Sequence, residues 1–182
     1  KSIRKIVFLI PKNKKNLPLL KYLIKKNYKY ICGPEKNVLS RYYTAANRFK
    51  SKYILRVTSD CPFVDSQLID QLFKKFLRKK INYASNTNPP SFPDGFDIEI
   101  FDFQSLKKTF KSTSSKSDLE HVTPFLIRNK RFKKFNLKHK KDFSKHKLSI
   151  DTKEDYIKVK KIFNSFNNIL IDYKNVLKKL RY

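Results

Sequence analysis

Two aspartates follow short apolar runs, and both could hold a metal ion. Asp60 comes after the run at residues 53–58, and Asp151 comes directly after residues 148–150. Ligands of open α/β sheets bind outside the carboxyl ends of the strands, so we expect both carboxylates at a functional edge. Mg²⁺ typically takes one or two carboxylates together with substrate phosphates. The pair therefore predicts a Mg²⁺ site that offsets the charge of a triphosphate.

Each aspartate also has a structural interpretation. Asp60 can cap the turn that follows its strand. Asp151 opens the sequence DTKE, in which it would be the N-cap of a helix with Glu154 at the third helical position. A cap and a metal ligand use the same lone pairs, so the two interpretations of Asp151 compete.

A second acidic group lies in the middle of the chain. Asp94 begins an Asp-Gly turn, and Asp97 and Glu99 fall on one face of the alternating stretch at residues 96–100. Such a stretch predicts a strand with one wet face, where the acids pair with surplus lysines. The alternative is a rigid set of acceptors for sugar hydroxyls.

The other reactive residue types give weaker signals. Cys61 and His121 have no partner in the sequence that would make a nucleophile–base pair. We expect Cys32 and Cys61 to be buried, reduced thiols of a cytoplasmic protein. With only Gly33 and Gly95 in the chain, no glycine-rich phosphate loop can be built.

The elements that position these residues alternate as strand and helix up to residue 80. Apolar runs at 5–10, 28–32 and 53–58 predict strands. Helices are expected to begin at Asn16, at Asn37 and at either Asp65 or Ser66. The alternation predicts a Rossmann-like, mostly parallel sheet with helices on both faces. The run at 5–10 is almost wholly apolar, which is typical of a strand covered on both faces.

Beyond residue 80 the predicted pattern is mixed. Short strands are expected at 83–86, 96–100, 132–137 and 148–150, and a helix at 117–128 despite Pro124. Further helices are expected after Asp151 and at 173–180. We expect one domain over 1–182, with 83–101 and 132–150 as mixed-sheet elements on the side where acceptors for sugar hydroxyls would lie.

The net charge is +28, from 43 basic and 15 acidic residues. The lysines are dispersed along the whole chain, which favours a compositional bias over a nucleic-acid surface, although nucleotide phosphates would still be attracted. No apolar run approaches the length of a membrane span, about 20 residues. We therefore expect no membrane partner and no nucleic acid, and leave a homodimer open.

Six blocks of the sequence, in order, resemble the spore-coat-polysaccharide type of cytidylyltransferase, a relative of the CMP-KDO and CMP-acylneuraminate synthetases. The first two are GPEKNVLSRYY at residues 33–43 and RVTSDCPFVD at residues 56–65. They are followed by YASNT at 83–87, FPDGFDIE at 92–99, EHVTP at 120–124 and LSIDTKED at 148–155.

The resemblance implies that CTP and a sugar or sugar acid give a CMP-sugar and pyrophosphate, with Mg²⁺ as the cofactor. It implies that Asp60 and Asp151 hold the metal ion. It also places Asp94, Asp97 and Glu99 near the sugar. Two further residues of the matching blocks, Arg56 and His121, are expected to contact substrate.

One part of the family pattern has no match. The family begins with a strand and the loop Q-A-R-x-x-S-x-R-L-P-G-K, whose Arg and Lys hold the CTP phosphates, and residues 5–10 resemble a later strand. We therefore expect the chain as given to bind CTP poorly, to turn over little and to leave strand edges open. The alternatives are a related nucleotidyltransferase with another nucleotide, and a truncated domain that acts as a binding module.

Overall fold

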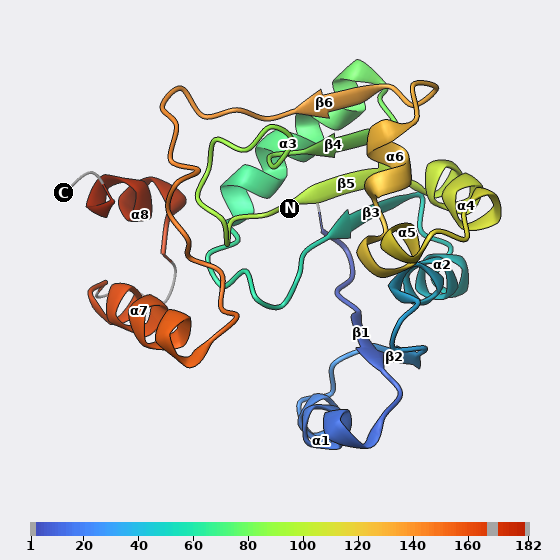
Figure 1. The fold of residues 1–182 in the computed structure, drawn as a ribbon, viewed down its shortest axis with the longest axis horizontal. Helices are drawn as coiled ribbons and strands as arrows, with labels where there is room; N and C mark the ends of the chain where they lie inside the picture. Colours follow the sequence, from blue (N-terminus) through green and yellow to red (C-terminus); the bar gives the residue numbers. More distant parts are fainter. Residues whose placement is uncertain (1–2, 167–170, 181–182) are drawn as a thin grey trace. The chain divides into compact units, whose positions relative to one another are not determined.

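The computed structural model describes residues 3–166 and 171–180, and the chain divides into two compact units (Figure 1). Unit 1 comprises residues 1–54 and 101–133, and unit 2 comprises residues 55–100 and 134–182. The chain passes between the units within β3 (Tyr53–Arg56), within β5 (Glu99–Asp102) and just before β6 (Lys134–Asn136).

Unit 1 combines a two-stranded parallel sheet with helices. Strands β1 and β2 pair in parallel, with Leu9 opposite Ile31. Helix α2 packs against both strands and against α4 and α5. The elements are β1 (Phe8–Pro11), the 3-10 helix η1 (Lys14–Asn16), α1 (Leu17–Lys25), β2 (Tyr30–Gly33), α2 (Val38–Arg48), α4 (Phe103–Ser112), α5 (Lys116–His121) and α6 (Pro124–Arg128).

Unit 2 carries the larger sheet, whose strand order is β3-β5-β4-β6. Strand β4 pairs in parallel with β6, with Ala84 opposite Phe135. Helix α3 buries Leu68, Leu72 and Phe76, each at most 1% exposed. Besides β3, β5 and β6, the elements of this unit are α3 (Ser66–Lys79), β4 (Tyr83–Ser85), α7 (Lys153–Asn164) and α8 (Tyr173–Lys179).

Two of the predicted helix starts are confirmed. The Asn37 side chain accepts a hydrogen bond from the Ser40 amide at the start of α2, and the Asp65 side chain accepts from the amides of Gln67 and Leu68 at the start of α3. Both caps satisfy amides that have no partner inside the helix. The prediction for Asn16 is wrong in detail, because its side chain does not cap α1.

The single helix predicted over 117–128 is wrong. The structure has two short helices, α5 and α6, separated at Val122, whose φ is +71°. Pro124 has no amide proton and opens α6 instead of continuing α5. Asp118 of α5 is fully buried and binds the guanidinium of Arg128.

The prediction that residues 5–10 are covered on both faces is also wrong. Within the described residues β1 has only β2 as a strand partner. Ile6 is 67% exposed and Phe8 37%. Several other large apolar side chains of unit 1 are exposed as well, namely Ile3, Leu17, Leu19, Tyr22, Ile24, Tyr28 and Tyr30.

Three helices end in the same way although the chain has only two glycines. Asn27, Lys50 and Lys80 follow α1, α2 and α3 with φ between 48° and 55°. In each case the next amide donates to a carbonyl five residues back, as Ile81 does to Phe76. This is the Schellman ending, in which glycine is usual because a Cβ is unfavourable in left-handed backbone.

Lys80→Gly is therefore expected to raise the free energy of unfolding by about 1 kcal/mol, because it removes the cost of a left-handed lysine. Lys79→Gly, one residue earlier and inside α3, is the matched control. It should lower the stability by about 1 kcal/mol. Urea denaturation of the three proteins measures both changes, and equal effects of the two substitutions would contradict the proposed ending.

Candidate functional site

Three segments of unit 2 that carry predicted site residues lie side by side. The Ile150 amide donates to the Asp60 carbonyl oxygen at 2.9 Å. The Ser149 hydroxyl donates to the Asp94 carboxylate at 2.5 Å. Residues 149–151 thus lie next to both Asp60 and the Asp94 turn, which brings the first two acidic groups of the sequence together.

The strand predicted at residues 148–150 is not formed. A single bridge between Asp94 and Lys147 replaces it, with the Leu148 amide donating to the Asp94 carbonyl at 2.8 Å. Gly95 makes this approach possible, because its φ is +106° and a Cβ there would meet the Leu148 carbonyl carbon at 2.6 Å. The glycine is thus needed for the contact between the two acidic segments.

Asp97 is a partly buried acid with other acids nearby. Partial burial raises the pKa of its carboxyl to about 6, and the charges of Asp94, Glu99 and Asp60 contribute in that order. Burial likewise raises the pKa of the neighbouring Cys61 thiol to about 11. Cys61 is therefore a protonated thiol at neutral pH rather than a nucleophile, as its buried position predicted.

Asp151 is not the N-cap that the sequence predicted. The cap of α7 is Thr152, which forms a capping box with Asp155. The Asp151 side chain is 57% exposed and pairs with the Lys147 ammonium at 2.8 Å. The predicted competition between cap and metal ligand is thus absent, since capping uses the next residue along the chain.

Glu99 has a different environment from the other acids. One of its carboxylate oxygens accepts from Arg56 at 2.5 Å and the other from the Tyr83 hydroxyl at 2.6 Å. Glu99 is only 6% exposed, so the predicted wet strand face with lysine partners is wrong at this position. Burial, reinforced by the charge of Glu99, raises the pKa of Tyr83.

One of the predicted residues belongs to the other unit. His121 is exposed at the end of α5 and belongs to unit 1. No group of three or more His, Cys, Asp or Glu side chains suited to a metal ion is present among the residues that the structure describes. Any metal ion at Asp60 and Asp151 would need further ligands from substrate or water.

Sequence reasoning missed the residues that surround the acids. Tyr83 and Ser149 bind acidic side chains across distances in sequence that no local pattern reveals. The ion pair of Lys147 with Asp151 could have been predicted from the sequence, because Lys147 precedes Asp151 by four residues. Its ammonium also pairs with Asp155 at 2.6 Å, and both contacts raise its pKa.

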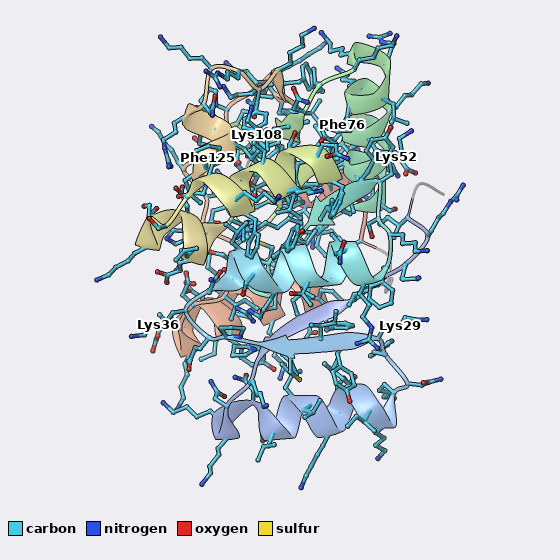
Figure 2. The ribbon with its side chains drawn as sticks, turned by 90° about the vertical axis from the view of Figure 1, so that its right-hand side faces the viewer. Lys29, Lys36, Lys52, Phe76, Lys108 and Phe125 are labelled. Atoms are coloured by element: carbon cyan, nitrogen blue, oxygen red, sulfur yellow. The ribbon has the colours of Figure 1, made fainter. Side chains whose placement is uncertain are left out.

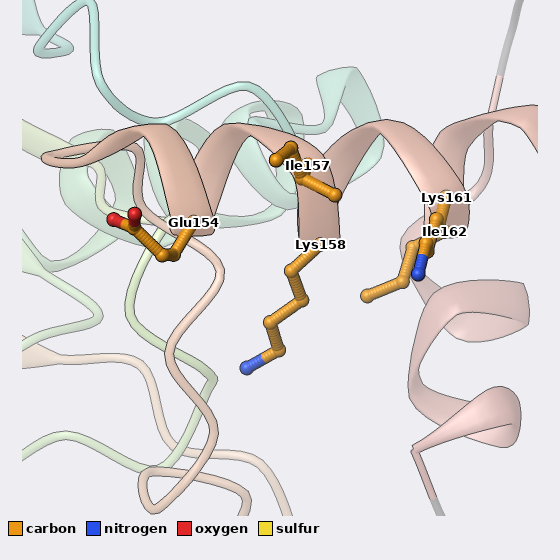
Figure 3. A pocket seen from close by; sticks show the side chains of 5 residues that line it. All are labelled: Glu154, Ile157, Lys158, Lys161 and Ile162. Carbon is orange, nitrogen blue, oxygen red and sulfur yellow. The ribbon is translucent and has the colours of Figure 1, made fainter.

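Two other surface features lie outside this group of acids. Lysines such as Lys29, Lys36, Lys52 and Lys108 are exposed (Figure 2), as expected for dispersed rather than clustered charge. An open pocket lies along α7, lined by Glu154, Ile157, Lys158, Lys161 and Ile162 (Figure 3). It contains none of the predicted site residues.

Comparison with known proteins identifies the family. A family model described as "Cytidylyltransferase" matches residues 28–182. The chain belongs to the cytidylyltransferase family. The prediction drawn from the six sequence blocks is therefore confirmed.

Two curated relatives of this cytidylyltransferase-family chain are longer than it is. An uncharacterised protein of Methanocaldococcus jannaschii is 31% identical over 148 residues, which are 80% of this chain and 60% of the relative. The spore coat polysaccharide biosynthesis protein SpsF of Bacillus subtilis is 28% identical over 152 residues, 78% of this chain and 60% of SpsF. The chain thus spans about 60% of the length of each relative.

Solved structures confirm the fold type. A cytidylyltransferase from Leptospira borgpetersenii is 28% identical with a TM-score of 0.91, over 96% of this chain and 75% of that one. A second structure is molybdopterin-guanine dinucleotide biosynthesis protein A from Archaeoglobus fulgidus. It is 14% identical with a TM-score of 0.58, over 88% of this chain and 79% of that one. At this identity the likeness shows the fold alone. The predicted Rossmann-like fold of the nucleotide-diphospho-sugar transferase type is confirmed.

None of the described helices has the length and apolar character to cross a membrane.

Asp97→Asn should change how stability depends on pH. A carboxyl whose pKa is about 6 in the folded protein and 3.8 ordinarily binds more protons folded than unfolded, so stability falls as pH rises from about 4 to 6. The substitution should remove this slope and raise the free energy of unfolding at pH 8 by about 1–2 kcal/mol, after allowance for partial solvent exposure.

Metal-free urea titrations between pH 4 and 8 measure the effect of Asp97→Asn. Asp142→Asn is the control, because Asp142 is exposed and its pKa is lowered by hydrogen bonds from Ser144. The stability that Asp142 contributes is lost as pH falls. Asp142→Asn should therefore change the slope of the free energy of unfolding against pH in the direction opposite to Asp97→Asn. The same slope in the wild type and in Asp97→Asn would contradict the assignment.

Glu99→Gln is expected to lower the free energy of unfolding by about 3 kcal/mol, because it removes the charge that offsets the partly buried Arg56 guanidinium. Tyr83→Phe removes only one hydrogen bond to the same carboxylate and should cost about 1 kcal/mol. Urea denaturation at pH 7 gives both values. A larger loss in Tyr83→Phe than in Glu99→Gln would show that the ion pair is not the principal interaction.

Proposed function

We propose that this chain carries the metal-binding and sugar-binding part of a CTP-dependent cytidylyltransferase. The reaction would join CTP and a sugar or sugar acid into a CMP-sugar and release pyrophosphate. The observation that carries this proposal is the adjacency of the Asp60, Asp94 and Asp151 segments within a chain of this family. The name of SpsF supports a product used in polysaccharide biosynthesis.

In the proposed reaction a sugar hydroxyl oxygen attacks the α-phosphorus of CTP and gives up its proton to solvent. The bond from that phosphorus to the β-phosphate oxygen breaks, and pyrophosphate leaves with the electron pair. Asp94 and Asp97 are the proposed acceptors for sugar hydroxyls, since the two acids lie near each other and near Asp60. Glu99 and Arg56 already bind each other, so their proposed contribution is to hold β5 against β3.

Asp60 and Asp151 are the proposed ligands of Mg²⁺. Two carboxylates fit an ion that takes its remaining ligands from phosphates and water, and the side chain of Asp151 is not used as a helix cap. When bound, the ion would offset the negative charge of the triphosphate and of the leaving pyrophosphate. Lys147 would have to share Asp151 with the ion, because its ammonium already pairs with that carboxylate.

Binding of Mn²⁺, used in place of Mg²⁺, should become at least tenfold tighter when CTP is added, and less so with ATP, GTP or UTP. Asp60→Asn and Asp151→Asn should each weaken the Mn²⁺–CTP complex by at least tenfold, because each removes one anionic ligand. Asp142→Asn, which removes an exposed acid of the same unit, should leave it unchanged. Electron paramagnetic resonance of free Mn²⁺ measures all four proteins.

Wild-type Mn²⁺–CTP binding in Asp60→Asn would refute the metal site. Pyrophosphate release in the presence of Mg²⁺, CTP and sugar acids, measured on the same proteins, separates two functions. Release confined to CTP identifies a cytidylyltransferase, whereas binding without release identifies a nucleotide-binding module. Release that is equal with all four nucleotides would contradict the preference for CTP.

A further inference from the structure

Arg41 of α2 is a buried cation whose guanidinium is only partly satisfied. The residue is 6% exposed, and its Nη1 donates to the Leu9 carbonyl of β1 at 3.0 Å. Its Nε is buried and has no hydrogen-bond partner among the described residues. A buried donor on a charged group is costly when no acceptor is present, so this arginine requires an explanation.

The Arg41 side chain reaches this position across Gly33. A Cβ on Gly33 would lie 2.7 Å from the Arg41 Cγ and 3.4 Å from its Cδ. The stem of the arginine therefore passes where any other residue would place a side chain. Gly33 and Arg41 belong to the same sequence block, and the structure gives a physical reason for their joint presence.

The guanidinium lies near the carboxyl ends of two parallel strands. Gly33 is the last residue of β2, and Leu9 pairs with Ile31 two residues before that end. The amides of Phe8 and Lys12 donate to the carbonyls of Lys29 and Gly33, on the β2 side of β1. The Leu9 carbonyl alternates with them and therefore points to the opposite edge of β1. In open α/β sheets, the region outside the carboxyl ends of the strands is where ligands bind.

The chemistry of the guanidinium favours a phosphate. Its Nε and the adjacent Nη2 form the edge that binds phosphate oxygens through two parallel hydrogen bonds. The neighbouring acid, Glu35, is exposed and acts on Arg41 through its charge. Burial lowers the pKa of Arg41 without removing its charge at neutral pH, so the site remains cationic.

We propose that Gly33 and Arg41 form a phosphate-binding position in unit 1, in which the Nε edge of Arg41 binds phosphate oxygens of a nucleoside triphosphate or of pyrophosphate. The choice of a nucleotide rests on the proposed function. The binding of a phosphate group does not, because it can be tested with inorganic pyrophosphate and no metal ion.

The first test follows the Nε–H resonance of Arg41 in the wild-type protein. Titration of ¹⁵N-labelled protein with sodium pyrophosphate, in EDTA and 200 mM KCl to screen the general positive charge, should shift this resonance and slow its exchange with water. Its absence from the spectrum of Arg41→Lys assigns it. No shift up to 10 mM pyrophosphate would overturn the proposal.

The second test separates position from charge. Arg41→Gln and Gly33→Ala should each weaken pyrophosphate binding, measured by calorimetry, by at least tenfold. Gly33→Ala keeps the net charge and has an unstrained backbone but displaces the arginine stem. Arg48→Gln, an exposed arginine on the same helix, loses the same charge as Arg41→Gln and should bind within twofold of the wild type.

Thermal unfolding of each variant, measured without ligand, shows whether it is folded. Folded Gly33→Ala with wild-type affinity would refute the proposed geometry, and equal losses in Arg41→Gln and Arg48→Gln would show general charge attraction only. The proposed function and the phosphate position can fail independently. If pyrophosphate binds at Arg41 while Mn²⁺–CTP binding does not depend on Asp60, the proposed function is refuted and the phosphate position is not. CTP in place of pyrophosphate then shows whether the nucleotide uses the same position.

Discussion

One carboxylate joins three neighbouring strands of the larger sheet. Glu99 lies on β5, between β3 and β4 in the strand order, and it binds Arg56 on one side and Tyr83 on the other. A buried ion pair is costly unless both partners are well hydrogen-bonded, and here both carboxylate oxygens are used. This interaction holds β3, which precedes Asp60, and β5, which follows Asp97. The positions of these two aspartates therefore depend on it.

The acids of unit 2 therefore have two different roles. Glu99 is neutralised by a fixed partner and is closed to solvent. Within the part of the chain that the structure describes, Asp60, Asp94 and Asp97 take part in none of the ion pairs. Burial raises the pKa of Asp97, and the negative charges of Asp94, Glu99 and Asp60 raise it further. A set of carboxylates that repel one another is favourable only when a cation offsets them, which is consistent with the proposed use of Mg²⁺.

The local rules of sequence predicted most of the architecture and the family. Apolar runs and caps located the strands and helices up to residue 80, because those signals act within a few residues. The same rules failed where distant segments compete. A bridge between Asp94 and Lys147 replaces the strand predicted at residues 148–150. Glu99 is buried and bound by Arg56 and Tyr83, which lie on other strands. The incomplete hydrogen bonding of the Arg41 guanidinium could not be predicted from the sequence either, because it depends on β1, β2 and α2 together.

The exposed apolar side chains at the start of unit 1 have a consequence for the protein in solution. At low ionic strength the net charge of +28 keeps molecules apart, despite residues such as Ile6 and Tyr22 on the surface. Salt shortens the range of that repulsion to about 8 Å at physiological ionic strength, while apolar attraction is undiminished. Added salt is therefore expected to promote self-association of this chain.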